Sequence, residues 1–408
     1  MNKKHLYFPA QTPEIVVQLP ASKSISNRAL IINALAYSDY EIQNLAKCDD
    51  TDVLVKALNS DDNVFDIGAA GTSMRFLTAF LAKTVGEWMI TGSERMKNRP
   101  VGVLVDALNE LGARIEYVEK QGFPPLRIFG SALTGGEIRL DGSISSQYIS
   151  ALMMIAPYMQ NGLKITLAGK IVSVPYIQMT IQIMKEFGVE VGFNGQIIEI
   201  KPQEYRPVVF RVESDWSAAS YWYEILSLVQ KGKIFLPRLF ENSFQGDSRV
   251  ATLFEQFGVH TEYQNDGVLL TPVESCISVF EYDFVDQPDL TQTFAVTCCL
   301  KNIPFRFKGV QSLKIKETNR IEALINELKK TGYLLYEPEH GQLAWDGEKC
   351  EADEELNICT YEDHRMAMAF APVAFFRPVN IENPEVVNKS YPGFWNDIEK
   401  LEHQNINY

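Results

Sequence analysis

The strongest constraint on the fold is a phrase that recurs along the chain: an amphipathic helical pattern that ends in glycine and is followed at once by a strand-like run. The terminal glycines of the four clear copies lie 76, 70 and 74 residues apart. Glycine just past a helix adopts the left-handed conformation without strain, so each copy predicts a helix end and then a strand. The clear copies are Leu104–Tyr117, Thr180–Phe193, Val250–Tyr263 and Arg320–Tyr336, and their helical parts end at Gly112, Gly188, Gly258 and Gly332. Weaker copies are Asp50–Leu58 and Gly393–Leu401.

A second series of helical segments keeps step with the first. Each is richer in apolar and small residues and begins in a polar cluster, which predicts a buried helix. Together the two series indicate six βαβαββ-like units of about 70 residues, which is large for a linear solenoid and favours three units in each of two α/β domains. The buried helices are expected at Ser26–Ala36, Thr72–Ala82, Ser146–Pro157, Asp215–Leu228, Asp289–Leu300 and Asp363–Phe375.

Composition narrows the class of function. The 408 residues carry 38 Lys and Arg against 52 Asp and Glu, a formal charge of −14, which argues against non-specific binding of nucleic acid or anionic membranes. The first twenty residues lack the apolar run of a signal peptide, and no apolar stretch is long enough to span a bilayer. The six cysteines are scattered without metal-binding spacing, and the adjacent Cys298 and Cys299 fit a buried helix. These features predict a cytoplasmic protein with reduced thiols.

The polar clusters at the helix starts are candidate anion sites. Ser, Thr or Asp there fits an ordinary N-cap, but helix starts that combine Gly-Thr or Ser-Ser with a basic residue also expose N–H groups to phosphate or carboxylate. Several basic residues fall at these starts or in neighbouring turns, where α/β sheets bind ligands. They are Lys23, Arg28, Arg95, Lys97, Arg99, Lys314, Lys316, Arg320, Arg365 and Lys389.

Two carboxylates are interleaved with these cations. Glu317 lies between Lys316 and Arg320, and Asp289 follows Pro288 at a helix start. Among cations a carboxylate can accept or donate a proton, although Glu317 also fits an i,i+3 ion pair and Asp289 an N-cap. The chain lacks GxxxxGK[ST], GxGxxG after a strand, GxSxG and HExxH, so anionic ligands are expected without a nucleotide, a cofactor, a metal or a covalent nucleophile.

Ordered motifs over nearly the whole length resemble the family of 5-enolpyruvylshikimate-3-phosphate synthase, an enolpyruvyl transferase family. They are SKSISNRAL, GAAGTSMR, GSERMKNRPVGVLVDAL, DGSISSQY, VSVPYIQMT, NSFQGDSR, PDLTQT, KIKETNR and TYEDHRMAM. The resemblance implies two similar domains of three βαβαββ units each, of the inside-out α/β barrel type, with a cleft between them. The expected domains are residues 21–213, and residues 1–20 together with 214–408.

The resemblance also implies an activity: transfer of the enolpyruvyl group of phosphoenolpyruvate to the 5-hydroxyl of shikimate 3-phosphate, with release of phosphate. The implied shikimate 3-phosphate residues are Lys23, Ser24, Arg28, Ser145, Ser146, Gln147, Ser173, Tyr176, Asp289, Ser312 and Lys316. The implied phosphoenolpyruvate residues are Lys23, Gly71, Thr72, Arg95, Gln147, Arg320, His364, Arg365 and Lys389.

The implied catalytic residues are Lys23, Asp289 and Glu317. Glu317 is expected to protonate the methylene carbon of phosphoenolpyruvate and Asp289 to accept the hydroxyl proton, while Lys23 assists the departing phosphate. The assignment of each carboxylate to one half-reaction stays open.

Four positions depart from the family pattern. Ala69 stands where the family usually has Asn, and Phe76 where it commonly has Pro, which leaves the response to the inhibitor glyphosate open. Ser312 replaces a usual Asn, and Val174 replaces a usual Lys. No charged catalytic residue is lost, so activity is expected.

Two other functions remain as alternatives. A related enolpyruvyl transferase acts on a UDP-linked amino sugar, but the loop after Gly86–Arg99 lacks the cysteine which that enzyme would carry. A non-catalytic anion-binding homologue is the second alternative, against which the intact Lys23, Asp289 and Glu317 argue. The expected partners are the two small substrates, with no nucleic acid and no membrane, and the expected state is a monomer.

Overall fold

The computed structural model describes residues 2–8 and 12–401. The chain divides into two compact units. Residues 21–212 form one, called here the N-terminal unit, and residues 1–20 with 213–408 form the other, called the C-terminal unit. Residues 402–408, the end of the second predicted domain, lie outside the described residues.

The buried helices form where the sequence predicts them, with starts that differ by at most three residues. The first begins at Lys23, one turn earlier than predicted. In the fifth, every residue from Thr291 to Cys299 is buried, as expected for a helix without a polar face. Cys298 and Cys299 are fully buried, as predicted. The six are α1 (Lys23–Leu35), α3 (Gly71–Lys83), α6 (Ser146–Ile155), α8 (Trp216–Val229), α10 (Thr291–Leu300) and α12 (His364–Phe370).

The amphipathic helices of the first series also form, and the four glycines take the predicted left-handed conformation, with φ of 99°, 82°, 88° and 101°. The strand predicted after Gly332 is wrong in part, because Tyr333 and Tyr336 pair only through isolated bridges to Lys349 and Ala344. The helices of this series are α2 (Asp49–Leu58), α5 (Gly102–Glu110), α7 (Val174–Glu186), α9 (Val250–Glu255), α11 (Arg320–Lys330) and α13 (Phe394–Glu399), and the short α4 (Glu94–Lys97) lies outside the series. Short 3₁₀ helices are η1 (Ala156–Tyr158), η2 (Gly246–Arg249), η3 (Pro288–Leu290), η4 (Gln311–Ile315), η5 (Ala371–Phe375) and η6 (Pro384–Lys389).

The sheets repeat one topology, in which two parallel strands are followed by an antiparallel one. In the N-terminal unit the orders are β3-β4-β6-β5 and β7-β8-β10-β9. In the C-terminal unit they are β2-β11-β13-β12, β14-β15-β16 and β17-β18-β1. The N-terminal unit also has a parallel bridge between Gln43 and Arg211.

The strand bounds follow the chain order. They are β1 (Lys3–Leu6), β2 (Glu14–Val16), β3 (Val64–Asp66), β4 (Gly86–Thr91), β5 (Arg114–Tyr117), β6 (Leu126–Gly130), β7 (Gly136–Asp141), β8 (Leu163–Ala168), β9 (Gly192–Phe193), β10 (Ile197–Ile200), β11 (Lys233–Pro237), β12 (Val259–Gln264), β13 (Gly267–Pro272), β14 (Phe280–Asp283), β15 (Phe305–Lys308), β16 (Leu343–Trp345), β17 (Asn357–Ile358) and β18 (Val379–Glu382).

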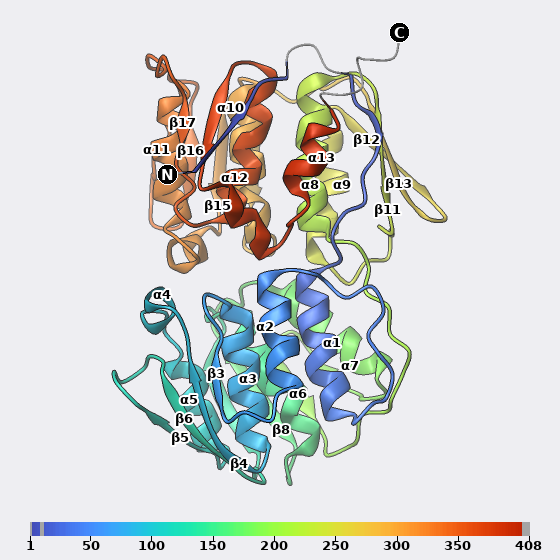
Figure 1. Ribbon diagram of the computed structural model, residues 1–408, viewed down its shortest axis with the longest axis vertical. Helices are drawn as coiled ribbons and strands as arrows, with labels where there is room; N and C mark the ends of the chain where they lie inside the picture. The colour runs from blue at the N-terminus through green and yellow to red at the C-terminus, as the bar shows by residue number, and fades with distance from the viewer. Residues whose placement is uncertain (1, 9–11, 402–408) are drawn as a thin grey trace. The chain divides into compact units, whose positions relative to one another are not determined.

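In the C-terminal unit α8, α10 and α12 run side by side, with β11–β13 on one side of them and β15–β17 on the other (Figure 1). Their side chains form the hydrophobic core of that unit, which includes Trp216, Trp222 and Phe294. Among the described residues, no helix combines the length and apolar character that a bilayer crossing requires.

Candidate functional site

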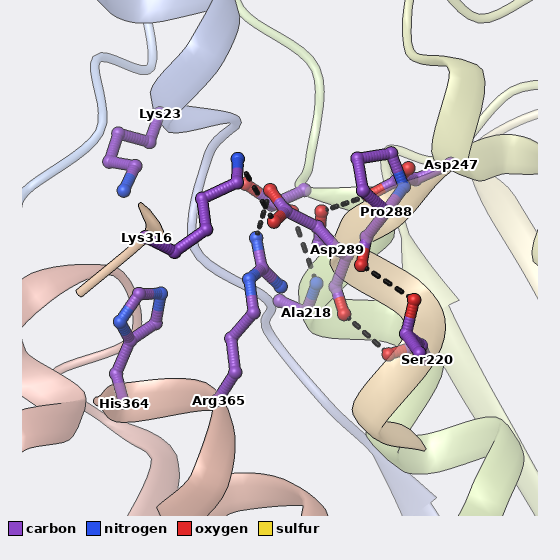
Figure 2. Close-up of polar contacts among 12 residues, drawn as sticks. Lys23, Ala218, Ser220, Asp247, Pro288, Asp289, Lys316, His364 and Arg365 are labelled. Atoms are coloured by element: carbon purple, nitrogen blue, oxygen red, sulfur yellow. Dashed lines mark hydrogen bonds and ion pairs between the residues drawn. The ribbon is translucent and has the colours of Figure 1, made fainter. Parts of the chain in front are cut away.

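In the C-terminal unit, Asp289 lies among three cations. It occupies η3, just before α10. Its Oδ1 accepts a hydrogen bond from Nη1 of Arg320 at 2.9 Å, and its Oδ2 accepts one from Nη2 of Arg365 at 2.9 Å. Nζ of Lys316 is 3.7 Å from Oδ1. Figure 2 shows Asp289 between Lys316 and Arg365. The alternative of a simple N-cap does not hold, because the N-cap residue of α10 is Leu290.

The charges around Asp289 decide its protonation. Burial alone would raise the pKa of this carboxyl, but Arg365, Lys316 and Arg320 outweigh burial and hold the pKa well below its usual value. Burial has the stronger effect on Lys316 and lowers the pKa of its ammonium group. Asp289 is therefore ionised at neutral pH.

Arg320 is the centre of the cluster. It is the first residue of α11 and is almost fully buried. Its Nη2 donates to Oε2 of Glu317 at 2.9 Å, so the i,i+3 ion pair anticipated for Glu317 is present. Its Nε donates to Oδ2 of Asp363 at 2.6 Å. With Asp289 as the third partner, one guanidinium joins three carboxylates.

Glu317 has a second cation partner. Its Oε1 lies 3.0 Å from Nζ of Lys389, at the end of η6. The side chains of Glu317 and Lys389 are 14% and 12% exposed, so the pair is partly open to solvent. Within the C-terminal unit four cations thus surround two proposed catalytic carboxylates, and all six groups lie at or next to the ends of short helical elements.

His364 and Ser312 are two further predicted site residues of this unit. His364 is buried in the first turn of α12, with Nδ1 3.7 Å from Oδ1 of Asp363. Ser312 lies in η4 and is partly exposed. The resemblance to the family implies a ligand contact for each of these two residues.

In the N-terminal unit, Arg28 is a buried cation. Its Nε donates to Oγ1 of Thr180 at 2.8 Å, its Nη2 to Oγ of Ser150 at 3.0 Å and its Nη1 to the carbonyl of Ser24 at 2.9 Å. Burial lowers its pKa to about 10, which still leaves the guanidinium charged at neutral pH. The guanidinium carbon lies 5.9 Å from the ring centre of Tyr176, another predicted site residue.

The starts of α3 and α6 meet in the same unit. Nε2 of Gln147, in the first turn of α6, donates to Oγ1 of Thr72, in the first turn of α3, at 3.1 Å. The two helices differ in their N-cap residues. Oγ of Ser145, the N-cap of α6, accepts a hydrogen bond from the backbone N–H of Gln147 at 3.4 Å, whereas Ala70, the N-cap of α3, has no side chain that can cap the helix. The N–H groups at the start of α3, at Gly71 and Thr72, can therefore donate hydrogen bonds to a bound anion.

The remaining predicted residues of the N-terminal unit also lie at element starts. Lys23 begins α1 and pairs with Asp50 at 3.1 Å. Ser173, the N-cap of α7, is a buried non-glycine residue at φ 57°, a costly conformation found at functional sites. The others are Ser24 in α1, Ser146 as the first residue of α6, and Arg95, exposed in α4.

The departure at Phe76 does not distort α3, which is continuous from Gly71 to Lys83. The Phe76 side chain is fully buried, and its ring centre lies 5.3 Å from the guanidinium carbon of Arg28. This aromatic residue therefore packs against the buried arginine.

The sequence alone did not predict three buried carboxyl groups as site residues: Asp50, Asp247 and Asp363. Asp363 and Asp50 each contact a predicted site residue, Arg320 and Lys23 respectively. Asp247 accepts a hydrogen bond from Ser217, and burial, with the charge of Asp289, raises its pKa to about 7. Figure 2 shows Asp247 on the far side of Pro288 from Lys316. Asp247 lies in the motif NSFQGDSR and Asp363 in the motif TYEDHRMAM. In the sequence alone, an acidic residue at a turn is interpreted as a helix cap, so neither was predicted as a site residue.

The described residues contain no group of three or more His, Cys, Asp or Glu side chains arranged to hold a metal ion. The polar chemistry of both units is instead that of guanidinium, ammonium, hydroxyl and carboxylate groups. Such groups bind small anions that carry phosphate or carboxylate.

Comparisons with known proteins agree with this fold and chemistry. The model of the family described as EPSP synthase (3-phosphoshikimate 1-carboxyvinyltransferase) matches residues 11–60 and 55–398. The 3-phosphoshikimate 1-carboxyvinyltransferase of Bacteroides fragilis (strain YCH46) is 57% identical over 97% of each chain. That of Vibrio cholerae serotype O1 (strain M66-2) is 35% identical over 94% of this chain and 96% of its own.

A solved structure of EPSP synthase from Acinetobacter baumannii has a TM-score of 0.78, with 98% of both chains covered and 18% identity. This confirms the predicted fold class: α/β, of the kind shared by EPSP synthases. The fold and the anion-binding groups define a transferase of the enolpyruvyl type. The chain belongs to the EPSP synthase (3-phosphoshikimate 1-carboxyvinyltransferase) family.

Proposed function

We propose that this protein transfers the enolpyruvyl group of phosphoenolpyruvate to the 5-hydroxyl of shikimate 3-phosphate, which yields 5-enolpyruvylshikimate 3-phosphate and inorganic phosphate. This is a step of the shikimate pathway, which leads to aromatic amino acids. The observation that carries the proposal is the placement of Asp289 and Glu317 among Lys316, Arg320 and Lys389 in a member of this family.

The proposed phosphoenolpyruvate site consists mainly of cations and one helix start. Arg320, Arg365 and Lys389 supply the positive charge in the C-terminal unit, because phosphoenolpyruvate carries a phosphate and a carboxylate. In the N-terminal unit the start of α3 offers N–H groups to an anion. The full proposed set is Lys23, Gly71, Thr72, Arg95, Gln147, Arg320, His364, Arg365 and Lys389.

The shikimate 3-phosphate role falls on hydroxyl groups and buried cations. Hydroxyl and amide groups can bind the sugar-like hydroxyls of shikimate, while Arg28 and Lys316 neutralise its phosphate and carboxylate. The full proposed set is Lys23, Ser24, Arg28, Ser145, Ser146, Gln147, Ser173, Tyr176, Asp289, Ser312 and Lys316.

The reaction is an addition followed by an elimination. Glu317 donates a proton to C3 of phosphoenolpyruvate, the 5-hydroxyl oxygen attacks C2, and Asp289 accepts the hydroxyl proton, which gives a tetrahedral ketal. A carboxylate, Glu317 or Asp289, then removes a methyl proton while the C2–O bond to phosphate breaks. Lys23 stabilises or protonates the departing phosphate.

The ion pairs of Asp289 bear on this mechanism. With its pKa held well below the usual value by Arg365, Lys316 and Arg320, Asp289 is a weak base before substrates arrive. Anionic substrates that pair with the same cations compete for that stabilisation, so substrate binding increases the basicity of Asp289.

The decisive test measures phosphate release. Phosphoenolpyruvate is incubated with shikimate 3-phosphate or with a UDP-linked amino sugar, and phosphate is followed over time. We expect release with shikimate 3-phosphate and none with the sugar nucleotide. Release with the sugar nucleotide alone would overturn the proposal, and binding of shikimate 3-phosphate by calorimetry without turnover would support a non-catalytic homologue.

Replacing Arg28 by Ala tests the shikimate 3-phosphate assignment. We expect KM for shikimate 3-phosphate to rise by about 10-fold or more, since a charge-assisted hydrogen bond contributes about 1.5–3 kcal/mol, while KM for phosphoenolpyruvate changes little. Steady-state rates at varied concentrations of each substrate check this. The melting temperature must be measured in parallel, because Arg28 also bonds Thr180 and Ser150. An unchanged KM for shikimate 3-phosphate would remove Arg28 from its site.

Three further assignments belong to the same proposal. The two compact units correspond to two domains of three βαβαββ units each, the protein acts as a monomer, and it works in the cytoplasm without nucleic acid or membrane partners. Light scattering at assay concentration tests the monomer: a mass near 46.2 kDa is expected.

A further inference from the structure

Asp363 contacts two of the three arginines of the proposed phosphoenolpyruvate set, Arg320 and Arg365. It is the N-cap residue of α12 and is fully buried. Its Oδ1 accepts a hydrogen bond from the backbone N–H of Arg365 at 2.9 Å. Its Oδ2 accepts from Nε of Arg320 at 2.6 Å, and Oδ1 accepts from Nη2 of Arg320 at 3.3 Å. One carboxylate therefore fixes the guanidinium of Arg320 and the helix start that carries Arg365.

The three carboxylates on Arg320 differ in burial. The side chain of Asp363 is 0% exposed, whereas those of Asp289 and Glu317 are 15% and 14% exposed. Asp363 binds the inner Nε edge of the guanidinium, while Asp289 and Glu317 bind Nη1 and Nη2. An anion that arrives from solvent can displace the two partly exposed carboxylates, but Asp363 has no solvent to move into.

The charges in the cluster make this difference important. Arg320 is 1% exposed, so its charge always needs a counterion. Without Asp363, the carboxylates paired with Arg320 would be Asp289 and Glu317, which the proposed mechanism must release from Arg320 so that they can act on the substrate. With Asp363, Arg320 stays paired while Asp289 and Glu317 exchange their partners for the substrate.

We propose that Asp363 is a positioning residue for phosphoenolpyruvate: it is the permanent counterion that orients Arg320 and the start of α12, so that Arg320 and Arg365 together present their outer N–H groups to the anionic substrate. The inference rests on the proposed function. It assigns to Asp363 an effect on phosphoenolpyruvate binding and none on shikimate 3-phosphate binding.

The test uses Asp363→Asn and Asp363→Ser in the full chain. Asn and Ser are both good N-cap residues, so each preserves the start of α12, but neither supplies a negative charge to Arg320. We expect KM for phosphoenolpyruvate, measured at saturating shikimate 3-phosphate, to rise about 10- to 100-fold, the range that loss of a charged hydrogen bond produces. KM for shikimate 3-phosphate is expected to stay within about twofold.

Asp397→Asn is the matched control. Asp397 is a buried carboxylate of the same unit that binds Tyr391 at 2.7 Å and Lys400 at 2.5 Å and contacts no residue of the proposed site. We expect it to lower the melting temperature without changing either KM. Equal changes in both KM values for the Asp363 variants, or no change in either, would overturn the inference.

Unfolding of both Asp363 variants, with Asp397→Asn folded, would overturn it too, because it would assign Asp363 to stability alone. Failure of the proposed function is a separate result: the unaltered protein would then release no phosphate from phosphoenolpyruvate and shikimate 3-phosphate.

Discussion

Glu317→Gln is expected to lower kcat for phosphate release by about 10²–10⁴-fold, the range for loss of a general acid. Gln has nearly the same shape as Glu, so it preserves packing beside Arg320 and Lys389, but it cannot transfer a proton to C3 of phosphoenolpyruvate. Binding of shikimate 3-phosphate, measured by calorimetry, should stay nearly unchanged, since Glu317 is not among its proposed contacts.

Glu322→Gln is the control for this variant. Glu322 is exposed in the first turn of the same helix, α11, and its side chain bonds Asn319 rather than any proposed site residue. It should leave kcat unchanged. A Glu317→Gln enzyme that turns over at the rate of the unaltered protein would remove Glu317 from the mechanism.

Glu224→Gln is expected to stabilise the protein at neutral and alkaline pH. Glu224 lies on α8 in the core of the C-terminal unit, is 0% exposed, and neither side-chain oxygen has a hydrogen-bond partner within 3.5 Å among the described residues. Burial raises the pKa of this carboxyl well above its usual value, and the nearby Thr297 hydroxyl opposes that effect only in part. Ionisation of Glu224 therefore costs the folded protein stability.

The sign of the pH dependence follows from proton binding. Between the pKa of Glu224 in the unfolded chain, about 4.3, and its higher pKa in the folded chain, the folded state holds one more proton. The free energy of unfolding therefore falls by about 1.4 kcal/mol for each pH unit in that window, and the contribution is fully present only below the unfolded pKa. Gln does not titrate, so the variant avoids this loss.

Chemical denaturation of both proteins between pH 5 and pH 8 measures the effect. The stability difference in favour of Glu224→Gln should grow as the pH rises above about 4.3, the pKa of Glu224 in the unfolded chain. Glu262→Gln, an exposed position on β12, serves as the control and should show no such growth. A difference that is constant with pH would show that Glu224 is not protonated in the folded protein.

Local sequence patterns were sufficient for the repeating elements. A helix with apolar residues on all sides is expected to be buried, as α10 is. Glycine past a helix end tolerates positive φ, and Gly112, Gly188, Gly258 and Gly332 adopt it. The segment after Gly332 is the exception, because a strand needs a neighbouring strand in register, and its pairing partners lie beyond Gly341.

The sequence proposes residues for the candidate site, but it does not predict which of them contact one another. The cations and two carboxylates could be found because they stand at helix starts within motifs of one family. Which carboxylate contacts which cation depends on contacts between segments far apart in the chain, such as Arg320 with Asp363, 43 residues away. Asp363 and Asp50 were missed for this reason, since at a helix start each reads as an ordinary cap.

The sequence by itself determined the class of fold, the family and the types of side chain available for anionic substrates, because these depend on periodicity, turn residues and ordered motifs. Only the tertiary structure decided the electrostatic state of those side chains. Asp289 and Glu317 share Arg320 with a third, fully buried carboxylate, and Glu224 lies in a core without a hydrogen-bond partner within 3.5 Å among the described residues. Burial and charge at short range set the pKa of such groups, and neither can be read along the chain.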